Sequence, residues 1–345
     1  MEKILSAYGF QVNNCKVNAF GSGLINSTWT IEKGGEKYIL QKINDAIFKK
    51  PEDIAWNIDL LDSYLGEHHK DYLFTSPVKT TDGKSMLHIE GDGYYRIFAF
   101  VPNSHSIDVV KTPDQAYEAA RQFGKFTRLL SGINADDLRI TLPSFHDLSL
   151  RYNQFQEALQ KGDAQRIAES ADLIKELQSH SDISEEYEKI KQNPDFKQRV
   201  THHDTKISNV LFNNADKAIC VIDLDTIMPG YFISDVGDMM RTYLSPVSEE
   251  EKDFDKIQIR DEFFKAIVKG YRQEMESELT ETEMKYFFYS GTFMIYMQAL
   301  RFLTDHLNND VYYGARYEGH NFIRAKNQAT LLKRLLEKKE ILSQF

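Results

Sequence analysis

Cysteine is almost absent from this sequence, and long apolar runs are missing. The two cysteines, Cys15 and Cys220, cannot form a disulfide framework or a cysteine-rich zinc site. Apolar runs such as Ile97–Val101 are far too short to span a bilayer. The first residues have neither a basic start nor an apolar core, so we expect no signal peptide. These absences predict a protein of the reducing cytoplasm with no membrane partner.

Glycine, proline and positive charge are also scarce. The 345 residues include 18 glycines and 8 prolines, too few for a disordered or collagen-like protein. Lysine and arginine number 42 against 52 acidic residues, a formal net charge of −10. This charge disfavours nucleic acid as a partner, because it repels a phosphate backbone. Hydrophobic residues make up 41% of the chain, enough for a large core in two domains or two lobes.

The pattern of the chain changes near residue 102. Before it, short runs of strand character alternate with glycine turns, and the pair Gly34 and Gly35 separates two such runs as in a hairpin. One helix is predicted here over residues 51–65, with Pro51 at a first helical position. After residue 102, helices are predicted at 114–130, 148–161, 163–180, 183–192, 249–276, 281–308 and 321–342, with a β interlude at 198–225.

These patterns predict an α+β, bilobal fold. The small lobe, residues 1–101, is an antiparallel β lobe with one helix and ends in a connecting strand. The larger, mainly helical lobe is residues 102–345. A ligand site is expected at the junction of the two lobes.

Residues 200–225 carry the side chains best suited to chemistry. Asp204 is followed five residues later by Asn209, and a buried strand after the next turn ends at Asp223. Strands joined by a turn bring Asn209 and Asp223 to neighbouring ends of a hairpin. An amide oxygen and a carboxylate suit Mg²⁺. Phosphoryl transfer needs this set, because Mg²⁺ bridges the phosphates while a separate carboxylate, Asp204, accepts the proton of the acceptor hydroxyl.

Two histidines in this segment leave another interpretation open. His202, His203 and Asp204 could together form a transition-metal site, but adjacent residues of a strand point to opposite faces. We expect instead that His202 bonds to the backbone of the catalytic loop. The Arg-Asp and Asp-Phe-Gly motifs of protein kinases are absent.

The pattern His202-x-Asp204-x-x-x-x-Asn209, followed by Val-Ile-Asp223, resembles the aminoglycoside phosphotransferase and choline kinase superfamily. Within it, the N-acetylhexosamine 1-kinases are the most similar branch, on the segments 20–26, 38–44, 223–230, 235–241 and 301–306. The resemblance spans residues 17–335. It implies a protein-kinase-like fold and a small-molecule kinase of carbohydrate metabolism. The implied reaction uses ATP and Mg²⁺ to convert an N-acetylhexosamine to its 1-phosphate.

The nucleotide site is expected in the small lobe. A glycine hairpin would let backbone N–H groups approach the phosphates, and a nearby amide would add a side-chain contact; these residues are Gly21, Ser22, Gly23 and Asn26. The resemblance implies that the connecting strand holds adenine, through Phe98, Ala99, Phe100 and Val101.

Lys42 is the expected basic residue beside the phosphates. Related kinases often carry this residue one position earlier, where the chain has Gln41, and a shift of one residue changes the face of a strand. Either the register differs or the role has moved. The carboxylate partner of Lys42 is expected on the helix at 51–65, from Glu52, Asp53 or Asp59.

The acceptor site is predicted in the large lobe. Asp225 either supports the metal ligands or accepts a sugar hydroxyl. Two pairs lie one helical turn apart, and such pairs either bind hydroxyls or form structural ion pairs; they are Asp238 with Arg241, and Arg301 with Asp305. Further candidates are Phe145, His146, Asp147, Tyr312, Tyr313 and Arg324.

Several functions stay open at this point. An acidic, aromatic cleft would favour a choline-like amino alcohol or an aminoglycoside as acceptor, whereas an arginine-rich lining favours a sugar. Outside enzymes, the alternative is a kinase-like protein that binds nucleotide without turnover. The presence of Asp204, Asn209 and Asp223 argues against that alternative. The oligomeric state is left open.

Overall fold

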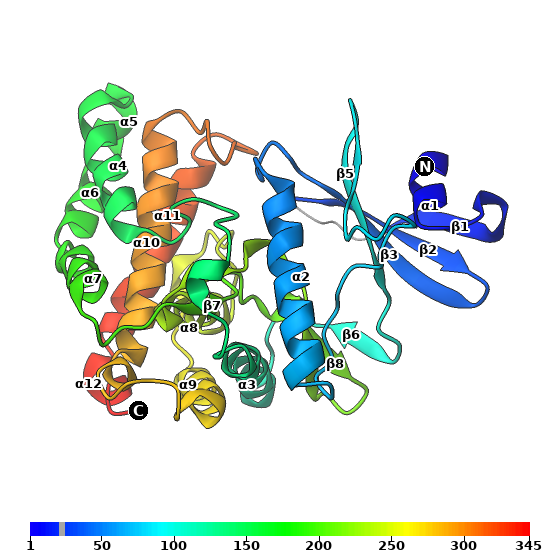
Figure 1. Cartoon of the computed structure of the whole chain (residues 1–345). Coiled ribbons are helices and arrows are strands. Elements are labelled where there is room, and N and C mark those ends of the chain that lie inside the picture. The colour runs from blue at the N-terminus through cyan, green and yellow to red at the C-terminus, as the bar shows by residue number, and fades with distance from the viewer. Residues whose placement is uncertain (21–24) are drawn as a thin grey trace.

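Figure 1 shows the computed structural model of the chain, in which residues 1–20 and 25–345 are described. A twisted antiparallel sheet stands beside a larger, mainly helical part, which confirms the predicted α+β, kinase-like fold. The predicted phosphate hairpin at Gly21, Ser22 and Gly23 lies outside the described residues.

The sheet contains five strands in the order β1-β2-β3-β5-β4. Their bounds are β1 Cys15–Ala19, β2 Ser27–Lys33, β3 Glu36–Ile43, β4 Leu87–Ile89 and β5 Gly93–Ala99. The predicted hairpin joins β2 to β3, and Gly34 and Gly35 adopt the positive φ angles, 60° and 88°, that such a turn needs. Side chains alternate between the two faces of each strand. One face, with Leu40, forms a small core under helix α1, Glu2–Ala7.

Helix α2, Pro51–His68, begins at the expected proline. Its buried side chains, including Ile54, Ile58 and Leu61, belong to the core of the helical part rather than to the small core of the sheet. The helix therefore ties the two parts together along its length (Figure 1).

The helical part is built around α10, Phe287–Leu307, which is buried on almost every side. It packs against α4, α8 and α11. The remaining bounds are α3 Pro113–Leu129, α4 Leu148–Lys161, α5 Ala164–Glu169, α6 Ala171–Gln178, α7 Asp182–Gln192, α8 Phe232–Tyr243, α9 Asp261–Met275, α11 His320–Leu336 and α12 Lys339–Leu342. Among the described residues, no helix combines the length and apolarity needed to cross a membrane.

The predicted β interlude supplies β7, β8 and β9 to two small sheets within the helical part, and β6 and β10 come from outside it. One has the order β6-β8-β9 and the other pairs β7 with β10. The bounds are β6 Ser104–Ser106, β7 Arg199–Thr201, β8 Val210–Asn213, β9 Ala218–Val221 and β10 Met228–Gly230.

Four predicted helices differ from the structure. The helix expected at 281–308 begins only at Phe287, after a short turn at Glu283–Lys285, and the helix expected at 321–342 is divided into α11 and α12. The helix expected at 249–276 begins only at Asp261, because Glu249 and Glu250 turn towards basic partners and Asp253 caps a separate short turn. The helix expected at 163–180 is broken at Ser170, which ends α5 and begins α6. The difference at 249–260 follows from the binding of Glu249 and Glu250 to basic residues elsewhere in the fold. The Ser170 hydroxyl is buried without a hydrogen-bond partner among the described residues, so its side chain does not explain the break at 163–180.

Candidate active site

The hairpin of β8 and β9 brings Asn209 and Asp223 together as expected. Asn209 ends the turn before β8, and Asp223 follows β9. The N–H of Ile222 donates to the backbone oxygen of Asn209 at 2.9 Å, which joins the two ends. Asp223 has φ 62° and ψ 63°, a left-handed conformation that aspartate tolerates better than most residues.

Asp204 belongs to the same cluster. The Asn209 amide nitrogen donates to the Asp204 backbone oxygen at 2.8 Å and to Asp204 Oδ2 at 3.0 Å. These bonds leave Asn209 Oδ1 as the acceptor atom of the amide. The surrounding protein desolvates the Asp223 carboxyl although part of the residue stays exposed, and together with the charges of Asp225 and Asp204 this raises the pKa of Asp223 to about 7.

An amide oxygen beside a carboxylate fits Mg²⁺, which prefers few protein oxygen ligands plus phosphates. Asp223 keeps an exposed surface, so a cation has access to it. The residues described here contain no group of three or more His, Cys, Asp or Glu side chains arranged to hold a metal. The histidine-based metal site is therefore not supported, whereas the Asn209–Asp223 pair suits a metal held jointly with nucleotide phosphates.

Helix α8 holds the loop of residues 202–206, which carries Asp204, through Asp235. The backbone N–H groups of His202 and His203 donate to Asp235 at 3.1 Å and 2.7 Å. The Thr205 hydroxyl donates to the Asp235 backbone oxygen at 2.7 Å. Sequence reasoning did not single out Asp235, although an acidic residue in the first turn of the helix after Asp223, the expected metal ligand, was the available signal.

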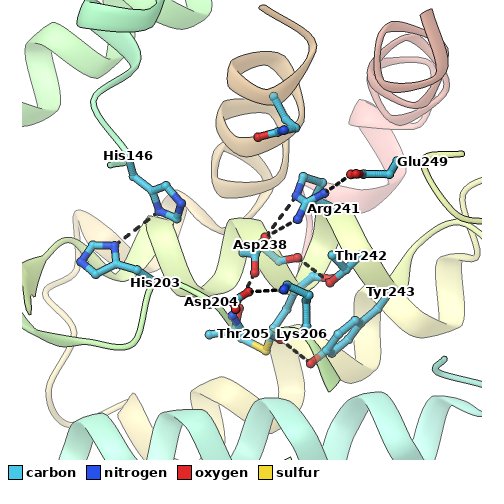
Figure 2. Close-up of polar contacts among 12 residues, drawn as sticks. His146, His203, Asp204, Thr205, Lys206, Asp238, Arg241, Thr242, Tyr243 and Glu249 are labelled. Atoms are coloured by element: carbon cyan, nitrogen blue, oxygen red, sulfur yellow. Dashed lines mark hydrogen bonds and ion pairs between the residues drawn. The ribbon is translucent and has the colours of Figure 1, made fainter. Parts of the chain in front are cut away.

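Asp238 holds the same loop one turn later. Asp238 Oδ2 accepts the Thr205 N–H at 2.9 Å, and Asp238 Oδ1 accepts from the Arg241 guanidinium at 2.9 Å and 3.1 Å. Arg241 Nη1 lies 2.8 Å from Glu249 (Figure 2). Of the two interpretations left open for Asp238 and Arg241, this geometry favours the structural ion pair.

His202 bonds to the loop backbone in the expected way, with its Nε2 3.0 Å from the Ile222 oxygen. His203 has φ 67° and faces His146, and their Nδ1 atoms lie 3.4 Å apart (Figure 2). Burial lowers the pKa of His203 to about 4, and burial with the charge of His203 lowers the pKa of His146. Both rings are therefore neutral at pH 7.

Lys206 is a site residue that sequence reasoning missed. Its Nζ lies 3.1 Å from Asp204 Oδ1 (Figure 2). Desolvation opposes its charge, but the carboxylates of Asp204 and Asp238 outweigh that effect and raise the pKa of Lys206. A lysine two residues after the expected catalytic aspartate was the signal that could have found it.

Asp225 meets the sheet rather than solvent. Arg96 Nη1 lies 2.5 Å from Asp225 Oδ1, and the Asn26 amide nitrogen donates to Asp225 Oδ2 at 2.7 Å. Asn26 Oδ1 accepts the Asn44 N–H at 3.0 Å. Asn26 and Asp225, expected to contact phosphate and support the site, are thus bonded to each other.

The structure does not bring Lys42 to this cluster. Lys42 Nζ lies 2.8 Å from Asp92 Oδ1 in an exposed ion pair, on the face of β3 opposite to Gln41. The prediction that Lys42 pairs with a carboxylate of α2 is wrong, because the three candidates there bind other residues: Glu52 binds Tyr94, Asp53 binds Arg139 and Asp59 binds Lys79.

The connecting strand places Phe98 and Phe100 in half-buried positions and exposes Ala99. The Phe100 N–H donates to the Lys37 oxygen at 3.0 Å, and the Val101 oxygen accepts the Ser104 hydroxyl at 2.7 Å. An adenine-binding role for this strand stays a prediction.

A cavity of about 440 Å³ opens between α4 and the end of α10. Its lining includes Arg151, Arg301, Asp305, Tyr312 and Tyr313. Both oxygens of Asp305 are engaged, by the Tyr312 and Tyr313 N–H groups at 2.7 Å and 2.9 Å. Of the predicted acceptor residues, Arg301 and Tyr312 therefore offer polar atoms to this cavity, and Asp305 supports its wall.

A profile of the phosphotransferase enzyme family (APH) matches residues 16–277. The chain belongs to this family, and it is accordingly a small-molecule phosphotransferase.

Three solved structures show the same fold at low identity. A microcompartment-associated aminopropanol kinase is 19% identical with a TM-score of 0.64, covering 98% of this chain and 97% of that one. A spectinomycin phosphotransferase in complex with ADP and spectinomycin is 14% identical with a TM-score of 0.59, covering 99% and 97%. A Plasmodium vivax ethanolamine kinase is 14% identical with a TM-score of 0.58, covering 95% and 85%.

Proposed function

We propose that this protein is an ATP- and Mg²⁺-dependent kinase whose acceptor is a sugar, with 1-phosphorylation of an N-acetylhexosamine as the favoured reaction. A role in carbohydrate metabolism follows from that acceptor. The observation that carries the sugar assignment is the charge of the cavity between α4 and α10.

Two arginines dominate this cavity. Glu157 is paired with Lys161 at 2.5 Å, and Asp305 is consumed by backbone donors. Arg151 and Arg301 have no carboxylate within ion-pair distance in the described part of the chain. Burial and the charge of Arg301 lower the pKa of Arg151. A cationic amino alcohol or aminoglycoside would be repelled here, whereas hydroxyl and carbonyl oxygens would accept from the guanidinium groups.

The cavity is connected to the expected catalytic base through aromatic contacts. The Arg301 guanidinium lies 5.7 Å from the centre of the Phe145 ring, and this ring stacks on His146 at 4.4 Å. His146 in turn contacts His203, the residue before Asp204. The cavity lining does not include Phe145, His146 or Asp204, so these contacts join the wall of the cavity to the loop that carries Asp204 without placing a bound hydroxyl beside that carboxylate.

The described residues account for the remaining steps. Asp204 would orient the acceptor hydroxyl and take its proton, while Lys206 holds the Asp204 carboxylate in place and offsets charge on the transferred group. Asn209 and Asp223 would hold Mg²⁺, which when bound offsets the charge of the ATP phosphates. The two neutral histidines add no charge that would compete for the base.

The direct test measures ADP release by the full chain with ATP, Mg²⁺ and one acceptor at a time. The panel contains N-acetylglucosamine, N-acetylgalactosamine, glucose, choline, ethanolamine, aminopropanol and an aminoglycoside. We expect release above the no-acceptor rate with an N-acetylhexosamine and none with the cationic acceptors. Release with a cationic acceptor alone would overturn the sugar assignment. No release with any acceptor, with ADP still bound, would favour the non-catalytic alternative.

A variant connects the activity to the cavity. Arg301→Gln removes one guanidinium without adding bulk, and we expect the acceptor KM to rise while the Kd for ADP stays unchanged. Arg272→Gln is the matched control, because Arg272 on α9 forms an exposed pair with Glu276, which follows that helix. An unchanged acceptor KM in Arg301→Gln would remove the cavity from the acceptor site.

A further inference from the structure

A buried ion pair joins the sheet to the segment that carries Asp223. Arg96 on β5 is 1% exposed and Asp225 is 2% exposed, and their Nη1 and Oδ1 atoms lie 2.5 Å apart. Asp225 stands two residues after Asp223. Removing either partner would leave an unpaired charge in the interior, which proteins avoid.

Gln41 fixes the plane of the Arg96 guanidinium. In the β3–β5 ladder Gln41 pairs directly with Arg96, so the two side chains share one face of the sheet. Gln41 Oε1 accepts from Arg96 Nε at 3.0 Å and from Arg96 Nη2 at 2.8 Å. The third nitrogen, Nη1, lies 2.5 Å from Asp225 Oδ1 as an ion pair, without the alignment of a hydrogen bond.

The Asp223 segment, residues 222–226, is also attached to the helical part, where His202 Nε2 lies 3.0 Å from the Ile222 oxygen. The Ile222 N–H donates to the Asn209 oxygen, and the Thr226 hydroxyl donates to the His202 oxygen at 2.6 Å. Arg96 and Asn26 bond to the same segment from the sheet side. The position of Asp223 therefore depends on both parts of the molecule.

We propose that Arg96 is a positioning residue of the nucleotide site. Clamped by Gln41 and paired with Asp225, it sets Asp223 in the position where that carboxylate meets Mg²⁺ and nucleotide. Lys42, one residue from Gln41, is on the opposite face and does not share this role. The inference rests on the proposed function, since it concerns the same Mg²⁺–nucleotide site.

A purely structural role is the alternative explanation of this pair. Buried ion pairs contribute little net stability compared with apolar residues of similar size. Residues that orient metal ligands, by contrast, typically change metal affinity or activity about 10–100-fold when they are substituted. The readout must therefore be ligand affinity in a folded variant, not stability alone.

The experiment measures the Kd of Mg²⁺·ADP by calorimetry, which needs no turnover. We expect Arg96→Gln to raise this Kd about 10–100-fold. Arg96→Lys should weaken binding as well, because a single ammonium cannot reach Gln41 and Asp225 together. Lys42→Gln should weaken binding less than Arg96→Gln does.

The exchange variant Gln41→Arg with Arg96→Gln tests the geometry. It moves one guanidinium to the opposite position on the same face, so we expect it to recover part of the affinity lost in Arg96→Gln. Arg139→Gln is the matched control: it removes an arginine between α2 and the helical part, 3.0 Å from the half-buried Asp53, but Arg139 itself is exposed. The control should bind Mg²⁺·ADP with wild-type affinity.

Each outcome has one meaning. A folded Arg96→Gln, or a folded Arg96→Lys where the first fails to fold, with a Kd within about twofold of wild type would overturn the inference alone. Equal weakening by Arg139→Gln would also overturn it, because the effect would then belong to any contact between the two parts. Wild-type protein that does not bind Mg²⁺·ADP would refute the proposed function itself.

Discussion

Replacing Asp235 by alanine should loosen the catalytic loop and destabilise the protein. Asp235 is 1% exposed, and its two carboxylate oxygens accept the N–H groups of His202 and His203. Alanine leaves both donors buried without a partner. An unsatisfied buried donor costs about 1–3 kcal/mol, so the expected loss is roughly 2–6 kcal/mol out of a typical total of about 5–15 kcal/mol.

Asparagine at the same position gives a graded comparison. Asp235→Asn keeps one acceptor oxygen, so we expect it to lose less unfolding free energy than Asp235→Ala. Both are measured by urea unfolding, alongside the rate of ADP release. Because the loop carries Asp204, activity should fall in both variants under conditions where the protein remains folded.

Thr242→Val is the control on the same helix, since the Thr242 hydroxyl bonds only to backbone oxygens of α8. Its unfolding free energy should change by less than about 0.5 kcal/mol, as for most changes away from special contacts. If the unfolding free energy of Asp235→Ala lies within about 1 kcal/mol of the wild-type value, the two bonds to the backbone do not hold the loop and the reasoning fails.

Three further predictions follow from the same region. Burial raises the pKa of Asp235 to about 7. The contribution of protonated Asp235 to stability is therefore complete below its unfolded pKa near 4 and is lost as pH rises towards 7. The difference in unfolding free energy between wild type and Asp235→Asn should shrink over that range, and a constant difference would contradict this prediction. Asp204→Asn should lower the rate of ADP release about 10²–10⁴-fold while calorimetry shows unchanged ADP binding; full turnover would exclude Asp204 as the base. Gly237→Ala on α8 places a Cβ 2.4 Å from the Ser290 backbone oxygen of α10. This overpacking should lower the unfolding free energy by about 1–3 kcal/mol or more, as measured by urea unfolding. A wild-type unfolding midpoint would show that α8 and α10 can move apart without cost.

Local chemistry explains which parts of the fold were predictable. The β2–β3 hairpin follows from a glycine pair that supplies positive φ, and α2 begins where Pro51 fits a first helical turn. The error at 249–260 has a non-local cause. Glu249 is bound by Arg241 on the preceding helix α8 and by Arg324, 75 residues later, and these contacts replace the helix that its charged neighbours suggested.

The site divides in the same way. The spacing of Asn209 and Asp223 at the two ends of one hairpin predicts by itself that their backbones are neighbours, because a turn of fixed length brings its strand ends together. Asp204 is joined to them by the amide of Asn209. Which basic residue of the sheet pairs with Asp225, two residues after Asp223, depends on the tertiary structure. Asn26 and Asp225 are 199 residues apart in the chain, and no local pattern indicates that contact or its partner Arg96. The pairing of β3 with β5 and the docking of the sheet on the Asp223 segment decide it, since they turn Gln41 and Arg96 inward and leave Lys42 outside.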